Sequence, residues 1–400
     1  PFPRYLKVLL LFSYYFGYEY TVMSRNYVLG WLFLCAFCAT YHPLRLRYLL
    51  LTGALALVSM TSIYGLLTAI ALLIFLILDQ TRVTWMPKVP AVFELSLSTK
   101  TVPTFLVVSI GMLFSAITLQ PSEPNVFASD WHLEFLSLNA VPRMLTRIMA
   151  GFLPLRHYAI GFWSSSDAFW DRNAWHLGIV GGGILLMSLL ALLPSWRLIV
   201  AYLGGVLAME LLQQVRYEGH PRHWGQYWVL FVAACWLLRS SFPRRRHVVS
   251  LLVMLAALGF QMQGFVVATV WDTKEVFSGG RDTAAFVRGQ GLQDLPLVAG
   301  PSWQVLSVTG HLRRPFISVE TEEFHETVVF HGRRRWFSMP ELVKRAVSVA
   351  RELNGPVLVV TTELLSPLPD GVSAVHLYTS PPSIIDDEVF FVYRLSVSAR

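Results

Sequence analysis

Long apolar segments, separated by short polar ones, dominate the first 270 residues of this chain. A helix needs about 20 apolar residues to cross the hydrocarbon core of a bilayer. Because hydrocarbon offers no partner to a free backbone amide, such segments must be helical. The pattern predicts a polytopic α-helical membrane domain over residues 1–271. Its candidate crossings are residues 5–23, 26–41, 48–78, 103–119, 176–193, 198–214, 226–240 and 247–270.

Charged residues divide the chain at the same place. Only 14% of the residues are charged, against about 25% in soluble domains. Residues 1–271 hold 19 Lys and Arg with 10 Asp and Glu, whereas residues 272–400 hold 13 and 15. The excess positive charge therefore belongs to the membrane part, where basic residues usually occupy loops. We predict a soluble domain over residues 272–400 and no nucleic-acid partner.

The segment 48–78 has 31 residues, which is too long for one upright membrane helix and too short for two full crossings. The segment Thr61–Gly65 in its middle is the only place where polar and flexible residues cluster. A hairpin with its tip there places 12 of the 19 basic residues on one face of the membrane, with Asp79 and Glu94 as their acidic neighbours. A single crossing would instead separate the earliest basic residues from the later basic loops. The hairpin interpretation is therefore favoured.

This interpretation sets the orientation, because cytoplasmic loops are enriched in Lys and Arg. It predicts about nine crossings of the plasma or inner membrane, with the basic cluster 239–246 in the cytoplasm. The C-terminal domain and the long loop 120–175 then lie on the extracytoplasmic side. Apolar stretches of that loop, residues 133–138 and 144–155, suggest short amphipathic helices in the membrane interface.

The C-terminal part alternates between helix and strand patterns, which predicts a small α/β domain with a largely parallel sheet. Ligands often bind such sheets at the carboxyl ends of strands, here residues 299–302 and 361–363. No glycine-rich phosphate motif stands there. The basic run 333–335 is interpreted as a solvated turn, with contact to a phosphate or lipid headgroup as the alternative. Helices are expected at 281–290, 302–312 and 340–353, and strands at 295–299, 316–319, 356–361, 375–378 and 389–395.

Three polar clusters lie in or beside the apolar segments, where ionisable residues are costly and often functional. The first contains Glu19, Arg25 and Tyr27; the alternative is an ion pair that only fixes helix packing. The second is the tight loop 216–225, whose Arg and His side chains suit phosphate, proton transfer or metal, or merely anchor the interface. The third occupies the long loop, with Asp130, His132, Glu134, Arg156, His157, Asp167 and Asp171.

Three segments of this chain resemble a known family of bacterial cell-envelope proteins. Residues 14–29, the break Thr61–Gly65 and the loop Arg222–Gly225 are similar to the glycosyltransferase C superfamily, such as protein mannosyltransferases and other polyprenyl-phosphate-sugar-dependent transferases. The resemblance implies inverting transfer of a sugar from a polyprenyl-phosphate donor to an extracytoplasmic glycan, lipid or protein. It also places the expected catalytic carboxylate upstream of Pro1, in a truncated N-terminal part, so no residue here is assigned that role.

The resemblance and the charge pattern together predict a substrate-binding site at the outer face. Arginine and histidine side chains would neutralise the phosphate leaving group, and Glu19 would orient Arg25 or contact the acceptor. No residue is assigned as a metal ligand, and participation of a divalent metal is left open. The alternatives are a transporter or flippase for a lipid-linked or anionic solute, and a non-catalytic membrane scaffold. The predicted site residues are Glu19, Arg25, Tyr27, Arg216, His220, Arg222 and His223.

Overall fold

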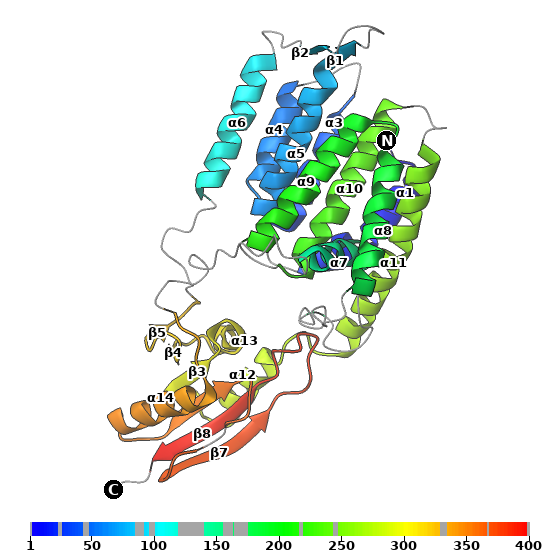
Figure 1. Cartoon of the computed structure of the whole chain (residues 1–400). Helices are drawn as coiled ribbons and strands as arrows, with labels where there is room; N and C mark the ends of the chain where they lie inside the picture. Colours follow the sequence, from blue (N-terminus) through cyan, green and yellow to red (C-terminus); the bar gives the residue numbers. More distant parts are fainter. Residues whose placement is uncertain are drawn as a thin grey trace. The chain divides into compact units, whose positions relative to one another are not determined.

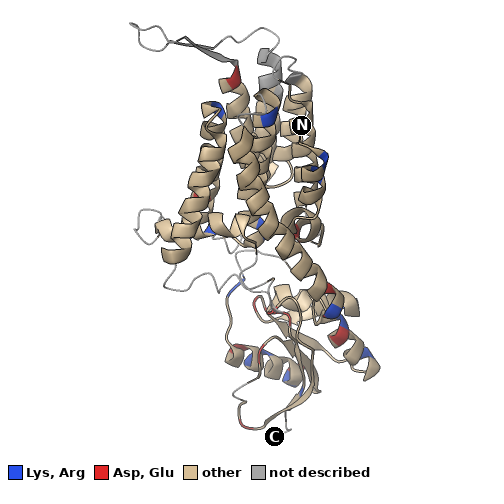
Figure 2. Ribbon diagram, turned by 90° about the vertical axis from the view of Figure 1, so that its right-hand side faces the viewer, with Lys and Arg blue, Asp and Glu red and all other residues tan. Residues whose placement is uncertain are grey.

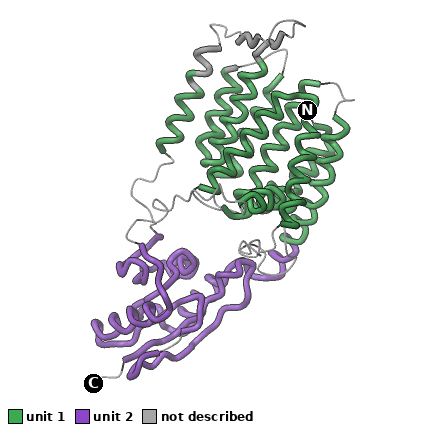
Figure 3. The backbone as a smooth tube through the Cα atoms, in the orientation of Figure 1, with its two compact units in different colours: residues 1–121, 131–156, 169–268 green, residues 122–130, 157–168, 269–400 purple. Residues whose placement is uncertain are grey.

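The chain divides into two compact units in the computed structural model (Figure 3). The first comprises residues 1–121, 131–156 and 169–268, and the second residues 122–130, 157–168 and 269–400. The structure describes residues 2–22, 26–42, 48–84, 92–95, 101–118, 140–154, 163, 175–215, 219–242, 247–328, 334–365 and 368–397.

The first unit is a bundle of helices (Figure 1). Most of their bounds are close to those predicted from the apolar segments, but the predicted crossing 5–23 is divided into α1, η1 and α2. One short antiparallel strand pair, β1 (Thr81–Thr84) and β2 (Val92–Leu95), follows the fifth α-helix. The helices are α1 (Arg4–Leu11), the π-helix η1 (Tyr14–Glu19), α2 (Tyr20–Val22), α3 (Tyr27–Thr40), α4 (Tyr48–Ser59), α5 (Ile63–Gln80), α6 (Thr101–Thr118), α7 (Ala140–Phe152), α8 (Trp175–Leu192), α9 (Trp196–Val215), α10 (Pro221–Ser241) and α11 (Val248–Lys274).

Among the described residues, three helices are long and apolar enough to cross a membrane: α8, α9 and α11. Shorter apolar helices cover residues 27–40, 49–59, 63–79 and 108–118. Large apolar side chains point outward, with Ile179 73% and Leu193 61% exposed, as expected of a surface that contacts lipid. Charged residues are sparse along these helices (Figure 2). The first unit is therefore a mostly helical membrane domain with three candidate membrane-spanning helices.

Helices α4 and α5 form the hairpin predicted for residues 48–78. The chain leaves α4 at Ser59 and enters α5 at Ile63, and Ser62 Oγ accepts the Gly65 amide hydrogen at 3.0 Å. A Cβ at Gly65 would stand 2.7 Å from Thr61 Oγ1 and overlap the Val58 carbonyl oxygen. The polar and flexible residues of the break are thus required by the tight reversal.

A polar contact joins four helices at one end of the bundle. Asp79, at the end of α5, accepts hydrogen bonds from Arg197 at 2.9 Å and from Tyr41 at 2.9 Å. Tyr41 also contacts Ser241, in the last turn of α10, at 3.4 Å. The basic-residue pattern predicted that Asp79 and Arg197 lie on the same face of the membrane, and the structure places them together at one end of the bundle. The 18 residues of α5 span about 27 Å, close to the hydrocarbon thickness of about 30 Å.

The second unit is a three-layer α/β domain around a six-stranded sheet of order β5-β4-β3-β6-β8-β7. Helices α12 and α13 cover one face of the sheet and α14 the other. The elements are α12 (Gly280–Gly289), β3 (Leu297–Gly300), α13 (Ser302–Leu312), β4 (Phe316–Ser318), β5 (Phe324–His325), α14 (Met339–Glu352), β6 (Val357–Thr361), β7 (Val372–Thr379) and β8 (Phe391–Val397).

The prediction of a largely parallel sheet is correct for three of the six strands and wrong for the other three. Strands β3, β4 and β6 are parallel, with Val298 opposite both Ile317 and Val359. Strands β5, β7 and β8 pair antiparallel with their neighbours. The reason is connectivity: helices link β3, β4 and β6, whereas no helix follows β6, and a parallel neighbour requires such a crossover.

Candidate functional site

A pocket opens at the end of the bundle where α3, α5 and α10 begin. Its empty space of about 310 Å³ includes open solvent, and the enclosed volume of about 10 Å³ has room for about one water molecule. Three stretches that are far apart in the sequence form its walls: α2 with α3, the α4–α5 hairpin, and α10. The lining residues are Tyr20, Tyr27, Gly30, Trp31, Leu34, Val58, Thr61, Ser62, Gly65, Thr68, Gln226 and Val229.

Buried hydrogen bonds of Tyr20 join α2 to α10 at the pocket wall. The Tyr20 hydroxyl accepts a hydrogen bond from Gln226 Nε2 at 2.8 Å and donates one to the Arg222 carbonyl oxygen at 3.0 Å. The Tyr20 ring also stacks on Tyr27, with ring centroids 5.4 Å apart. A hydroxyl and an amide are thus held in fixed positions within an otherwise apolar bundle.

His223 is held rigidly at the start of α10. Its Nδ1 accepts the His220 amide hydrogen at 2.9 Å, one half of a reciprocal capping box. In the neutral ring the proton is therefore on Nε2. The ring stacks on Tyr64 at 5.1 Å and meets the edge of Tyr27 at 6.2 Å. These contacts fix the imidazole beside the pocket and occupy one of its two nitrogen atoms.

Glu19 is the last residue of the π-helix η1, a helix type that often marks functional sites. Its side chain is buried, 2% exposed, and accepts a hydrogen bond from the Tyr14 hydroxyl at 2.8 Å. The next residue, Tyr20, lines the pocket, whereas Glu19 does not. The carboxylate is therefore bound within a cluster of tyrosines next to the pocket.

Of the predicted residues, Tyr27 lines the pocket and His223 lies beside it, whereas Arg222 joins these contacts through its carbonyl oxygen and His220 through its amide. Glu19 lies one residue from a pocket wall. Arg25 and Arg216 lie outside the described residues. The same holds for the predicted cluster of the long loop, Asp130, His132, Glu134, Arg156, His157, Asp167 and Asp171. In the described part of the chain, no three His, Cys, Asp or Glu side chains gather as metal ligands.

A buried ion pair is a feature that the sequence reasoning missed. Arg147 Nη1 lies 3.2 Å from Glu210 Oε2, and the two side chains are 2% and 1% exposed. Arg147 also donates to Gln214 Oε1 at 3.1 Å, and Gln213 donates to the Tyr227 hydroxyl at 2.9 Å. Positions 210, 213 and 214 share one helix face. Three polar side chains on one face of an otherwise apolar helix indicate polar partners inside the bundle, and the sequence already contained this pattern.

Helix α7, which carries Arg147, is packed into the bundle. The sequence predicted a short amphipathic helix within residues 144–155, and α7 is such a helix; most of its residues are buried against the bundle. Side chains satisfy its terminal carbonyl groups: Tyr15 donates to Ala150 at 3.0 Å, and Gln261 donates to Gly151 at 3.1 Å. A Cβ at Gly151 would overlap the Trp224 carbonyl oxygen. The ion-paired helix thus packs against the same end of α10 that borders the pocket.

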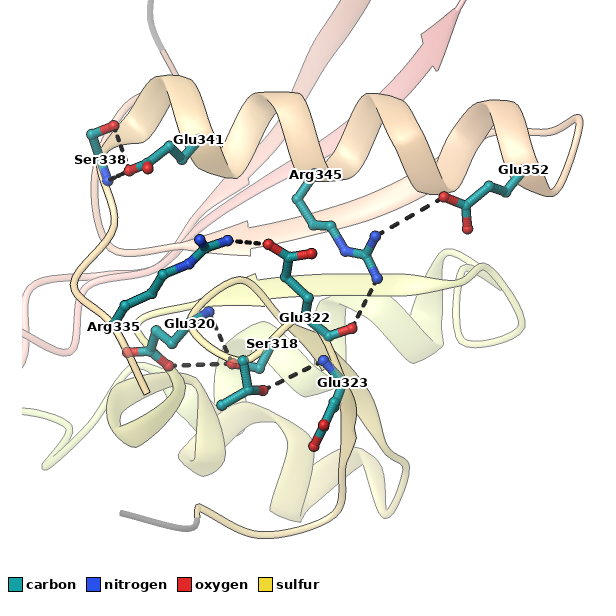
Figure 4. A network of polar contacts seen from close by, with 10 residues as sticks. Ser318, Glu320, Glu322, Glu323, Arg335, Ser338, Glu341, Arg345 and Glu352 are labelled. Atoms are coloured by element: carbon teal, nitrogen blue, oxygen red, sulfur yellow. Dashed lines mark hydrogen bonds and ion pairs between the residues drawn. The ribbon is translucent and has the colours of Figure 1, made fainter. Parts of the chain in front are cut away.

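The carboxyl edge of the sheet in the second unit is occupied by the protein's own carboxylate. Glu320 accepts hydrogen bonds from Arg334 at 2.7 Å and from the Ser302 amide at 3.1 Å. It also accepts one from Ser318 at 3.3 Å (Figure 4). The solvated turn expected at 333–335 is wrong for Arg334, whose side chain is 6% exposed, because this ion pair buries it. Glu320 occupies the α13 amino terminus, where such folds bind phosphate, so a nucleotide site gains no support.

No family model, curated protein or solved structure matches this chain. Its function is therefore inferred from the pocket and from the helices that form it.

Proposed function

We propose that this protein is a membrane glycosyltransferase, which moves a sugar from a polyprenyl-phosphate donor to an extracytoplasmic acceptor with inversion. One observation carries the proposal: the three segments that resemble such transferases meet at one pocket. Residues 14–29 contribute Tyr20 and Tyr27, the break 61–65 contributes Thr61 and Ser62, and the loop 222–225 is bonded to Tyr20. The three segments are far apart in the sequence, so chain connectivity alone does not bring them to one pocket.

The proposed topology is a multi-pass arrangement of about nine crossings in the plasma or inner membrane. The shorter apolar helices then cross together with α8, α9 and α11. The end of the bundle that holds Asp79 and Arg197 is proposed to be cytoplasmic, because the loops assigned to that side carry most of the basic residues. The pocket and the second unit face the extracytoplasmic side. A lipid-linked sugar could enter such a pocket sideways from the outer leaflet.

Each side of the pocket suits one part of this donor. Hydroxyl and amide groups of Tyr20, Ser62 and Gln226 would bind the sugar hydroxyls. The Trp31 ring stacks on Phe16, with centroids 3.8 Å apart, and its other face would cover the C–H groups of the sugar. Arg222, whose carbonyl oxygen accepts the Tyr20 hydrogen bond, is proposed to neutralise the phosphate with its guanidinium as the glycosidic bond breaks. Arg25 and Arg216 are proposed for the same role. The acceptor is a glycan, lipid or protein.

Donor binding tests this function without requiring turnover. The probe is radiolabelled mannose on polyprenyl phosphate, presented to the full chain in nanodiscs. Loss of a buried hydrogen bond or an aromatic contact costs about 1 kcal/mol, so Gln226→Ala and Trp31→Ala are each expected to weaken binding by about five- to tenfold. Leu32→Ala is the matched control, because Leu32 lies on the same helix and is 59% exposed.

Two outcomes would reject the proposal. One is a wild-type chain that does not bind the lipid-linked sugar more tightly than polyprenyl phosphate alone. The other is a set of pocket variants that bind as tightly as Leu32→Ala. Size-exclusion profiles of all variants would show whether a loss of binding is a loss of folding.

A further inference from the structure

The π-helix η1 stands directly before the pocket wall. Its hydrogen-bond register is that of a π-helix, since the Tyr20 amide at its end donates to the Tyr15 carbonyl oxygen, five residues back. An α-helix joins residues that are four apart, so a π turn holds one residue more than an α turn. The register of this turn therefore decides which of the following side chains faces the bundle.

Two side-chain contacts of η1 fit only the π register. The Tyr14 hydroxyl donates to Glu19 at 2.8 Å, and the ring centroids of Tyr15 and Tyr20 are 5.6 Å apart. Each pair is separated by five residues. In an α-helix, positions five apart point about 140° away from each other, because each residue turns by about 100°. Both contacts would then be lost.

The bond between Tyr14 and Glu19 is well placed to select the register. The two side chains are buried, 1% and 2% exposed, so water does not compete for the carboxyl oxygen. Loss of a donor to a buried polar group costs free energy. The π register keeps this donor and the α register removes it, so the bond stabilises the π-helix.

The register determines where Tyr20 points. Tyr20 lines the pocket and is bonded to Gln226 and to the Arg222 carbonyl oxygen on α10. Without the additional residue of the π turn, each following residue would take the place of the next one. Tyr20 would move to the place of Thr21, which is exposed, and its hydroxyl would leave the pocket wall.

We propose that Glu19 is a positioning residue of the pocket: its hydrogen bond with Tyr14 holds the π register that turns Tyr20 toward α10. Glu19 does not line the pocket itself, so it acts through Tyr20 and not by contact with the sugar. The inference deepens the proposed function and rests on it for the identity of the donor. The register of η1 can be measured without any donor.

Fluorine NMR of the full chain in nanodiscs reads the register, with meta-fluorotyrosine in place of Tyr20. A second sample, with meta-fluorotyrosine in place of Thr21, supplies the resonance of an exposed position. Tyr14→Phe and Glu19→Ala should each move the Tyr20 resonance toward that reference. Glu19→Gln should keep the wild-type resonance, because its amide oxygen also accepts a hydrogen bond. Tyr15→Phe is the matched control, since it removes a hydroxyl of the same helix that bonds to α7 instead.

Binding of radiolabelled mannose on polyprenyl phosphate then tests the link to the pocket. Tyr14→Phe and Glu19→Ala are expected to weaken binding about five- to tenfold, as for Gln226→Ala, because the Tyr20 hydroxyl is lost from the wall. Glu19→Gln and Tyr15→Phe should bind like wild type. Size-exclusion profiles accompany each variant, and Tyr14→Phe, which removes one oxygen atom, decides the matter if Glu19→Ala does not fold.

Three results would overturn the proposal. The first is a Tyr20 resonance that stays at its wild-type position in Tyr14→Phe and in Glu19→Ala. The second is a moved resonance with unchanged donor binding. The third is a Glu19→Gln variant that binds as weakly as Glu19→Ala, which would mean that the charge of Glu19 acts directly. If the wild type binds no donor, the proposed function fails, and the fluorine spectra still decide whether Glu19 holds the register.

Discussion

Replacing Arg147 by methionine should strongly destabilise the membrane domain. The substitution keeps most of the side-chain volume but leaves Glu210 without its cation in a site where it is 1% exposed. Breaking one side of a buried ion pair costs about 3–5 kcal/mol. Hydrogen bonds between membrane helices contribute only about 0.6 kcal/mol on average. Loss of the bond to Gln214 alone, as in Gln214→Leu, is therefore expected to be several times milder.

The double variant separates charge from packing. In Arg147→Met with Glu210→Met no buried charge is left, so stability should return close to wild type, as for other buried pairs replaced by apolar residues. The assay is unfolding of the full chain in mixed micelles with increasing SDS, followed by circular dichroism. Arg143→Met is the matched control on the same helix, because Arg143 is only half-buried. The single variants Arg147→Met and Glu210→Met could instead each lower the free energy of unfolding by less than about 1 kcal/mol, with additive effects in the double variant. That result would mean that the ion pair does not hold α7 in the bundle.

Two further predictions concern close packing and pH. A methyl group at Gly181 would overlap the Leu145 carbonyl oxygen, whereas nothing lies within 4 Å of a methyl group at Gly183. In the same SDS titration, Gly181→Ala should therefore lower the free energy of unfolding by about 1–3 kcal/mol. Gly183→Ala should leave it unchanged. Burial raises the pKa of the Glu388 carboxyl above its ordinary 4.5, so the folded state binds this proton more tightly than the unfolded state. The resulting stability is complete below pH 4.5 and is lost as the pH rises through the folded pKa. Glu388→Gln should remove this part of the pH dependence of the melting temperature and stabilise the protein at neutral pH; an unchanged pH profile would contradict the assignment.

The helix positions could be predicted because a long apolar segment has few alternatives in lipid. The hairpin of α4 and α5 was predictable from charge, since a single crossing would have separated the earliest basic residues from the later basic loops. The convergence of Tyr20, Tyr27 and the loop at Arg222 followed from the same topology. The secondary structure of the second unit was also readable, because its helices and strands alternate in clear periods.

Tertiary pairing could not be predicted. Arg147 and Glu210 are 63 residues apart, and an arginine on an amphipathic segment resembles an interfacial residue until its partner is known. The strand pattern of residues 372–379 and 391–397 likewise carries no direction, so the antiparallel pairing of β7 and β8 was missed. Arg334 looked like part of a solvated basic run because its partner, Glu320, reaches it only after β4 is placed in the sheet.

Photocrosslinking tests the central claim, that the pocket holds the sugar of a polyprenyl-phosphate donor. A donor analogue with a diazirine on the sugar would be irradiated with the full chain in nanodiscs, and the labelled residues identified by mass spectrometry. Labels should fall on Tyr20, Tyr27, Trp31 or Ser62 and be displaced by excess natural donor. Labels confined to outward-facing residues such as Ile179 and Leu193, or labels that excess donor does not displace, would contradict the account.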